Sequence, residues 1–276
     1  MVEKGFLAQL LVFSGRWSSG LRAIAARIRQ RAEYVLLPLA LAVFLGTWEL
    51  VVQLGGYPPF ILPSPGRVYD KLLGTLSSGL LWAHARVTVA EVLGGLALGL
   101  STAVVLGYWM AKSHLLERFV SLYIVASQAI PIVALAPLLI IWFGPGMLSK
   151  VLVCALTLFF PMLVNTMVGI RSVDPDLVDV MRSLRATRWQ MFALLEVPSA
   201  LPTLLGGLKV SMTLSVIGAV VGEFVAADRG LGFLINVARG NFDTPLMFVA
   251  LLTLVGIALL LYLTIVVLEN LFVRRR

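Results

Sequence analysis

The sequence is poor in charge and nearly devoid of cysteine and histidine. Only 13% of its 276 residues are charged and 59% are hydrophobic, whereas about 25% of a typical soluble domain is charged. The single cysteine, Cys154, excludes an intramolecular disulfide, and His84 and His114 have no second metal ligand nearby in the sequence. We therefore expect a membrane protein with no metal centre, in which Cys154 is a small buried apolar residue.

Two kinds of chemical motif are also missing. The chain contains no G-x-x-x-x-G-K-[ST] stretch, so it cannot cradle nucleotide phosphates by that route. Its apolar runs contain no convincing nucleophile–base pair or metal-ligand cluster. The net charge of +8 comes from short basic clusters between apolar runs, a pattern that indicates membrane topology rather than nucleic-acid binding.

The apolar runs have the length of membrane spans. A helix needs about 20 apolar residues to cross a bilayer, and six segments meet this requirement: 35–54, 87–110, 119–143, 150–170, 203–226 and 246–270. The Pro- and Gly-rich stretch "GGYPPFILPSPGRVYDKLL" follows the first span and leads into a possible short helix from Arg67 to about Leu81. The pattern predicts an all-α polytopic membrane protein with a single membrane domain over 34–276.

The distribution of Lys and Arg predicts the orientation of these spans. With the N-terminus inside, 16 of the 22 basic residues lie on the inner side, in agreement with the positive-inside rule. These are Lys4, Arg16, Arg22, Arg27, Arg29, Arg31, Lys112, Arg118, Arg171, Arg182, Arg185, Arg188, Lys209, Arg274, Arg275 and Arg276. Both termini are therefore expected in the cytoplasm.

The N-terminal segment, residues 1–33, is basic. Trp17, Leu21, Ile24 and Ile28 recur at helical spacing, and arginines occupy much of the remaining surface. This pattern is typical of an amphipathic helix on an anionic membrane surface. A frayed basic tail is the alternative.

The segment 171–202 has the pattern of a cytoplasmic helical hairpin. Asp174 before Pro175 indicates an N-cap followed by a first-turn proline. Thr187 with Gln190 three residues later predicts a capping box and hence a second helix start. Two short helices should therefore meet at 185–187. A plain interhelical loop packed on its own protein would have a similar pattern.

This hairpin resembles the coupling loop of the permease subunits of ATP-binding-cassette importers. The stretch "RSLRATRWQMFALLEVPSALP" is similar to the loop motif of the nitrate/sulfonate/taurine branch of this family, which includes riboflavin and pyrimidine-precursor permeases. "FILPSPGRV", "PIVALAPLLIIWFGPG" and "GEFVAADRGLGFLI" also resemble that branch, in the right order over about 45–270. The resemblance implies a type I importer permease fold with six transmembrane helices.

The resemblance assigns the contacts with the ATPase. In the loop motif of this family, Asp179 stands for a glutamate, Val180 and Met181 for two alanines, and Arg185 for a glycine. We expect a turn at Arg185 that does not demand positive φ. The residues implied in ATPase coupling are Asp179, Met181, Arg182, Ser183, Leu184, Arg185, Ala186, Thr187, Arg188 and Trp189.

Polar or helix-breaking residues within the spans are candidates for the translocation pathway or its gate. Such groups usually face a bundle interior or water, and the candidates are Ser127, Gln128, Pro131, Asn165 and Glu223. Pro131, with Pro137, should break the third span. Glu223 could line a gate, form a structural ion pair or reach the interface, and the neutral polar groups could equally join helices.

The function implied by the resemblance is that of an importer permease in the bacterial inner membrane. It would work with two ATPase subunits that bind ATP-Mg, an extracytoplasmic binding protein and a second permease copy, and it would bind no cofactor itself. The solute would be of the nitrate, sulfonate or taurine type, or a vitamin precursor such as riboflavin or a pyrimidine. The alternatives are an ion-coupled secondary transporter and, with less support, a membrane-embedded enzyme.

Overall fold

The computed structural model describes residue 36 and residues 38–272, so the predicted amphipathic segment 1–33 lies outside the described part. The chain divides into two units, Met1–Gly66 and Arg67–Arg276. Within the first unit, Pro38–Gly55 forms a helix long and apolar enough to cross a membrane. This confirms a spanning helix at the position predicted by the run 35–54.

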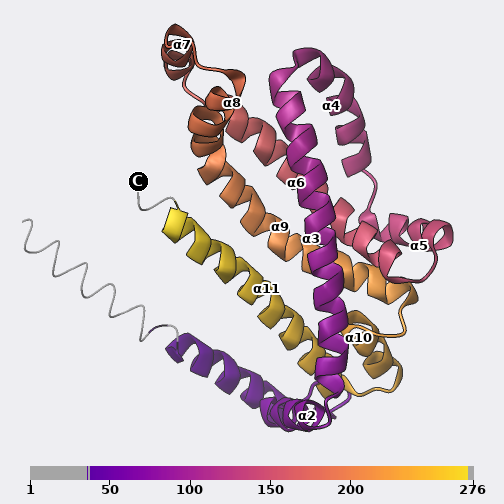
Figure 1. The fold of residues 1–276 in the computed structure, drawn as a ribbon. Helices are drawn as coiled ribbons and strands as arrows, with labels where there is room; N and C mark the ends of the chain where they lie inside the picture. Colours follow the sequence, from indigo (N-terminus) through magenta and orange to yellow (C-terminus); the bar gives the residue numbers. More distant parts are fainter. Residues whose placement is uncertain (1–35, 37, 273–276) are drawn as a thin grey trace, which may run out of the picture. The chain divides into compact units, whose positions relative to one another are not determined.

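The second unit is all-helical over its described residues (Figure 1). Its elements, the first of which begins at the boundary between the units, are α2 (Pro65–Ser77), α3 (Leu80–Lys112), α4 (His114–Gln128), α5 (Ile132–Phe143), α6 (Met147–Arg171), α7 (Pro175–Ser183), α8 (Arg188–Met191), the π-helix η1 (Phe192–Glu196), α9 (Val197–Ala226), α10 (Leu231–Gly240) and α11 (Thr244–Phe272). The helix α2 corresponds to the short helix expected from Arg67.

The third predicted span is a bent pair rather than one straight helix. Helices α4 and α5 meet at an angle of 97°. The break falls at Pro131, which precedes α5, whereas Pro137 lies inside that helix. The described residues thus contain five helices of spanning length, or six if the bent pair counts as one span. The predicted break is confirmed at Pro131, whereas the break predicted at Pro137 was wrong, because α5 continues through that residue.

Small residues allow close packing of α3 against α6. Gly95, Gly99, Ala103 and Gly107 recur every fourth residue of α3 and therefore lie along one face. A Cβ placed on Gly99 would stand 2.8 Å from the carbonyl oxygen of Ala155 on α6. Only glycine permits such an approach of two backbones, and this is how membrane helices gain contact area without a hydrophobic driving force.

Helix α9 packs against the same region of α6. A Cβ on Gly218 of α9 would stand 2.7 Å from the Cα atom of Cys154. Cys154 is fully buried and its thiol is free, which confirms its predicted role as a packing residue. Helices α3, α6 and α9 therefore form the packed centre of the second unit (Figure 1).

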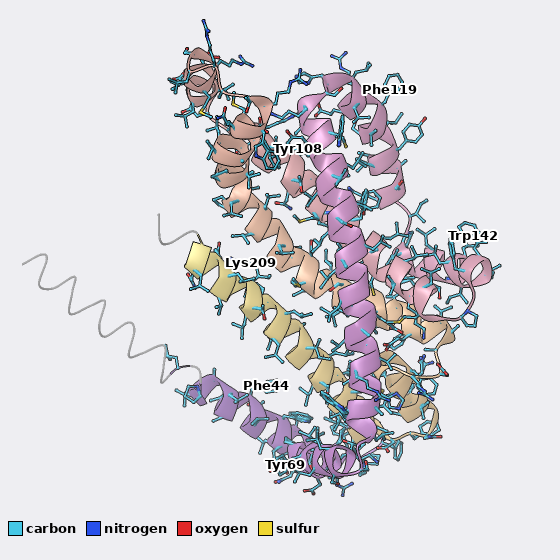
Figure 2. The ribbon with its side chains drawn as sticks, in the orientation of Figure 1. Phe44, Tyr69, Tyr108, Phe119, Trp142 and Lys209 are labelled. Carbon is cyan, nitrogen blue, oxygen red and sulfur yellow. The ribbon has the colours of Figure 1, made fainter. Side chains whose placement is uncertain are left out.

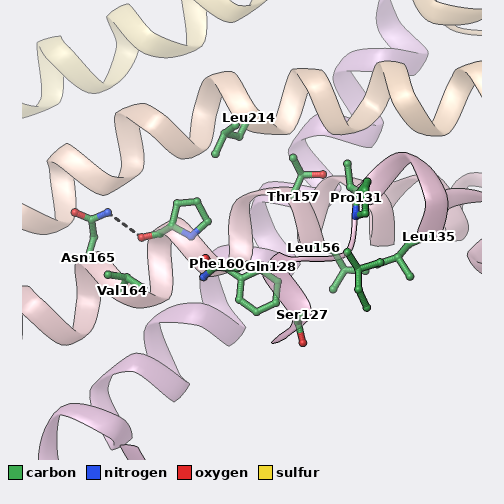
Figure 3. Close-up of a pocket in the computed structure, with 13 residues that line it drawn as sticks. Ser127, Gln128, Pro131, Leu135, Leu156, Thr157, Phe160, Val164, Asn165 and Leu214 are labelled. Atoms are coloured by element: carbon green, nitrogen blue, oxygen red, sulfur yellow. Dashed lines mark hydrogen bonds between the residues drawn. The ribbon is translucent and has the colours of Figure 1, made fainter. Parts of the chain in front are cut away.

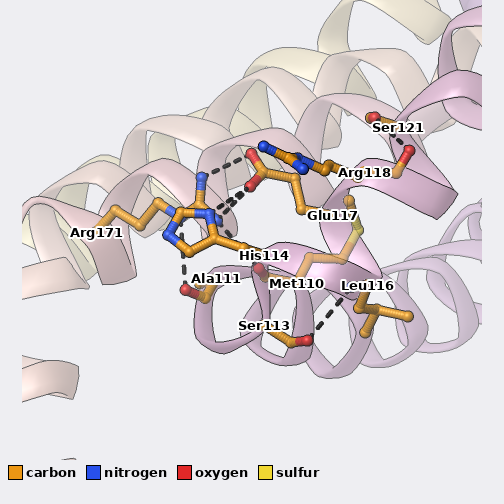
Figure 4. Close-up of polar contacts among 9 residues, drawn as sticks. All are labelled: Met110, Ala111, Ser113, His114, Leu116, Glu117, Arg118, Ser121 and Arg171. Atoms are coloured by element: carbon orange, nitrogen blue, oxygen red, sulfur yellow. Dashed lines mark hydrogen bonds and ion pairs between the residues drawn. The ribbon is translucent and has the colours of Figure 1, made fainter.

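The turn between α3 and α4 is tied to the end of α6 (Figure 4). The Arg171 guanidinium donates to both carboxylate oxygens of Glu117, each at 2.7 Å, and to the carbonyl oxygen of Met110 at 3.2 Å. The Ser113 hydroxyl accepts the Leu116 amide and caps α4. A bidentate arginine pair fixes orientation as well as distance, so it holds α4 where the chain leaves α6 for the hairpin.

Candidate translocation and coupling sites

The predicted hairpin is present and carries the predicted helix signals. The Asp174 side chain accepts the Asp176 amide at 2.9 Å, and Pro175 begins α7. The Thr187 hydroxyl accepts the Gln190 amide while the Gln190 side chain accepts the Thr187 amide, which completes a capping box at the start of α8. Each cap satisfies a backbone donor that would otherwise be unpaired at a helix end. Both predicted helix starts are confirmed.

The expected conformation of Arg185 was wrong. Its φ is 54°, which lies in the left-handed region. This conformation costs a non-glycine residue roughly 1–2 kcal/mol because Cβ approaches the following carbonyl oxygen. The strain is accepted because the turn closes α7 with two backbone hydrogen bonds, from the Arg185 amide to Arg182 and from the Ala186 amide to Met181. The position therefore has the backbone geometry for which glycine is suited.

The hairpin lies at one end of the long helices (Figure 1) and exposes both apolar and basic side chains. Leu184 and Trp189 are 73% and 72% exposed. Arg182, Arg185 and Arg188 are exposed as well, and Arg182 forms only a surface ion pair with Asp179, at 3.2 Å. An exposed aromatic and aliphatic pair flanked by arginines is a typical composition for a protein-binding surface.

A cavity of about 720 Å³ gathers four of the five pathway candidates. Ser127, Gln128, Pro131 and Asn165 all line it, although they come from α4, from the break before α5 and from α6 (Figure 3). The other lining residues are Ile130, Ile132, Leu135, Leu156, Thr157, Phe160, Pro161, Val164 and Leu214. None of the lining residues carries a charge, so the cavity offers apolar walls and a few neutral hydrogen-bonding groups.

The polar side chains of the cavity differ in how many hydrogen-bond donors and acceptors remain free to bind a solute. Asn165 Nδ2 donates to the Pro161 carbonyl oxygen at 2.8 Å, Ser127 Oγ donates to Tyr123, and Thr157 Oγ1 donates to Val153, the last two at 2.7 Å. Among the described residues, the side-chain amide of Gln128 has no hydrogen-bond partner. The cavity can therefore present an amide at Gln128 and acceptor oxygens on the other three side chains.

Glu223 lies apart from this cavity, near the start of α10. Its carboxylate accepts the Thr88 hydroxyl at 2.6 Å and the Gly232 amide, and the Thr88 hydroxyl in turn accepts the Leu231 amide at 2.8 Å. A Cβ on Gly230 would stand 2.2 Å from Glu223 Cδ. The "GEFVAADRGLG" motif is thereby explained as a buried carboxylate that caps α10, with glycines where it approaches the backbone.

A second buried carboxylate lies close to Glu223. Glu91 of α3 and Lys150 of α6 are almost fully buried, and Lys150 Nζ lies 3.4 Å from Glu91 Oε1. Charges at this depth are kept only when paired. Together with Glu223 they tie α3, α6, α9 and α10 at the end opposite the hairpin.

Sequence reasoning missed a third buried carboxylate, Glu196, at the end of η1. It contacts Lys112 and Tyr108 of α3. A carboxylate placed between apolar residues at the re-entry to the bilayer was the available signal, but its partners lie 84 and 88 residues away. Within the described part of the chain, no group of three or more His, Cys, Asp or Glu residues could hold a metal ion.

The spanning helices, the neutral cavity and the projecting hairpin define a membrane-embedded transport subunit. The chain belongs to the family of binding-protein-dependent transport system inner membrane components, whose model matches residues 103–276. It is therefore a multi-pass inner-membrane permease of an ATP-binding-cassette importer. It is not itself catalytic, and it works with an ATPase and a solute-binding protein.

Three relatives of this chain are permease proteins of transport systems. The chain is 50% identical to the riboflavin transport system permease protein RibX of Chloroflexus aurantiacus, over 91% of this chain and 95% of the relative. It is 37% identical to the formylaminopyrimidine transport permease protein ThiX of Halalkalibacterium halodurans (88% and 96%). It is 30% identical to the taurine transport system permease protein TauC of Escherichia coli (80% and 82%).

Solved structures share the fold at low sequence identity. An amino acid ABC transporter solved with histidines aligns with a TM-score of 0.57 at 20% identity, over 74% of this chain and 98% of that one. The MetNI methionine ABC transporter in an inward-facing conformation aligns with a TM-score of 0.59 at 19% identity, over the same shares. These likenesses concern the fold alone.

Proposed function

We propose that this permease imports a neutral, ring-shaped vitamin of the riboflavin type, and that the cavity between α4, α5, α6 and α9 is its half of the translocation pathway. The observation that carries the proposal is the absence of charge among the lining residues of the cavity. A sulfonate or nitrate ion held there would lose its hydration without gaining a cation, and an unpaired charge is costly in an apolar site. A neutral solute avoids that cost.

The chemistry of the lining fits a planar heteroaromatic ring. Phe160 and the neighbouring aliphatic side chains supply apolar walls, while Gln128 and Asn165 supply amide groups for imide or hydroxyl edges. A volume of about 720 Å³ lies within the usual range for sites that enclose small molecules. The higher identity to a riboflavin permease than to the taurine permease supports the same choice.

The hairpin is proposed as the contact with the ATPase. Met181, Leu184, Ala186 and Trp189 would enter an apolar groove of that partner, since a short helix seated in a groove transmits rigid-body motion. The remaining coupling candidates, Asp179, Arg182, Ser183, Arg185, Thr187 and Arg188, would form its polar rim, with the arginines opposite acidic groups. We further propose two copies of this chain with two ATPases.

The test is uptake by the complete importer in proteoliposomes, with its binding protein outside and ATP inside. Riboflavin and taurine serve as the two probes. We expect ATP-dependent uptake of riboflavin, and a roughly tenfold slower uptake for Asn165→Leu, which removes a polar partner from the cavity. Thr264→Val on α11, away from the cavity, is the control and should leave the rate unchanged.

The possible outcomes test the identity of the solute and the energy source of transport separately. ATP-dependent uptake of taurine without riboflavin would overturn the vitamin proposal and leave the importer intact. Uptake of either probe on a proton gradient alone, without ATP, would instead overturn the importer mechanism and favour a secondary transporter.

A further inference from the structure

The chain leaves the hairpin through a π-helical turn. The turn η1 covers Phe192–Glu196, between α8 and α9. One extra residue in a helical turn rotates the side chains that follow by about 100° relative to an uninterrupted α-helix. Such turns are rare and occur frequently at functional sites. Here the turn ends on the buried carboxylate of Glu196.

Glu196 joins this turn to the end of α3. Lys112 Nζ, on the last residue of α3, donates to Glu196 Oε1 at 2.5 Å. The Tyr108 hydroxyl donates to Glu196 Oε2 at 3.2 Å. Glu196 is only 6% exposed, so separating it from Lys112 would leave a buried carboxylate without its cation. Removing one partner of such a pair is far more costly than the pair is stabilising.

Aromatic contacts also connect the hairpin to α3. The ring of Trp189, exposed on α8, lies 5.5 Å from that of Phe192, and Phe192 meets Tyr108 edge to face at 5.4 Å. Lys112 Nζ lies 5.7 Å from the centre of the Tyr108 ring. Figure 2 shows Tyr108 of α3 beside the hairpin end of the bundle. The exposed tip of the hairpin is thus connected to α3 by both rings and charges.

We infer that Glu196 is a positioning residue for coupling, which makes α3 follow the hairpin when the ATPase moves it. The inference rests on the proposed contact between hairpin and ATPase. Helix α9 continues directly from η1 and follows the hairpin covalently, whereas α3 is distant in sequence. Because α3 is also packed backbone to backbone against α6 at Gly99, a displacement of α3 moves this packed centre as one body.

A second interhelical Glu–Lys pair provides a matched control. Glu269 of α11 accepts from Lys209 of α9, and both side chains are partly buried. This pair joins two spans but has no contact with the hairpin or η1 among the described residues. Glu269→Gln therefore removes an interhelical charge pair without touching the proposed transmission route.

The experiment measures molecules of ATP hydrolysed per solute imported, using the complete importer in proteoliposomes. For Glu196→Gln we expect an intact complex that retains ATP hydrolysis, with a ratio raised roughly 3- to 30-fold, the usual range for lost coupling. The exchanged pair Lys112→Glu/Glu196→Lys should restore most of the coupling. Glu269→Gln should leave the ratio unchanged.

The inference is overturned if Glu196→Gln reduces uptake and hydrolysis in equal proportion, or changes the ratio no more than Glu269→Gln does. If Glu196→Gln does not assemble, Tyr108→Phe decides the matter, because it removes only the hydroxyl that reaches Glu196; an unchanged ratio then refutes the inference. Failure of the proposed function would be distinguishable from failure of this inference, because the native complex itself would then show no hydrolysis-driven uptake.

Discussion

Replacing Gly99 by alanine tests whether backbone contact between α3 and α6 holds the centre of the protein together. The new Cβ would stand 2.7 Å from Leu158 Cδ1, 2.8 Å from the Ala155 carbonyl oxygen and 3.0 Å from Ala155 Cα. The leucine methyl can rotate away, but the Ala155 backbone cannot. The two helices must therefore separate by a few tenths of an ångström or more.

The size of the stability loss is measured against a glycine whose added Cβ would meet no neighbouring atom. Over-packing of this kind costs about 1–3 kcal/mol, while Gly→Ala in any helix gains about 1 kcal/mol of helix propensity. At Gly256 of α11, an added Cβ would meet nothing within 4 Å, so Gly256→Ala carries the propensity gain without the clash. The difference between the two variants isolates the packing cost, and we expect Gly99→Ala to be less stable by about 1–3 kcal/mol.

The assay is reversible unfolding in mixed detergent micelles, in which the free energy of unfolding of each variant is compared with that of the native chain. Equal stabilities of Gly99→Ala and Gly256→Ala, within about 0.5 kcal/mol, would refute the argument. That result would mean that α3 and α6 do not approach as closely as the glycine spacing requires.

Three further predictions concern the hairpin and the buried charges. Arg185→Gly should protect the turn amides from hydrogen exchange more than Arg185→Val by about 1–2 kcal/mol, because φ of 54° disfavours a β-branched residue; equal protection would contradict the left-handed turn. Thr187→Ala should weaken the protection of α8 amides by about 1 kcal/mol through loss of the cap, and unchanged exchange would show that the capping box is dispensable. Lys150→Met should lower the free energy of unfolding by about 3–5 kcal/mol by leaving Glu91 unpaired. Adding Glu91→Gln should recover part of this loss of stability. If it recovers none, the unpaired Glu91 carboxylate is not the cause of the destabilisation.

Much of the architecture could be predicted because apolar length and helix-end chemistry are local properties. Cap residues such as Asp174 and Thr187 act within three residues of their own position, so their pattern alone indicated where α7 and α8 begin. The break before α5 followed from Pro131 for the same reason. Four neutral or helix-breaking pathway candidates also line one cavity, because polar groups within spans tend to face a common interior.

Long-range partners could not be predicted in the same way. Glu91 and Lys150 are about 60 residues apart, and hydropathy identifies the face of a helix but not the residue that meets it. Glu196 contacts α3 from the end of a π-turn, a rare element with no clear sequence signal. The positive φ of Arg185 was missed because an arginine gives no local indication of a left-handed turn.

The most direct test of the account is co-purification of this permease with its ATPase, comparing the native chain with Arg182→Glu/Arg185→Glu. The account predicts a stable native complex that is lost or uncoupled when the charge of the hairpin is reversed, because the introduced glutamates would repel the acidic groups proposed on the partner. A native chain that never binds an ATPase, yet carries solute into vesicles on a proton gradient alone, would contradict it.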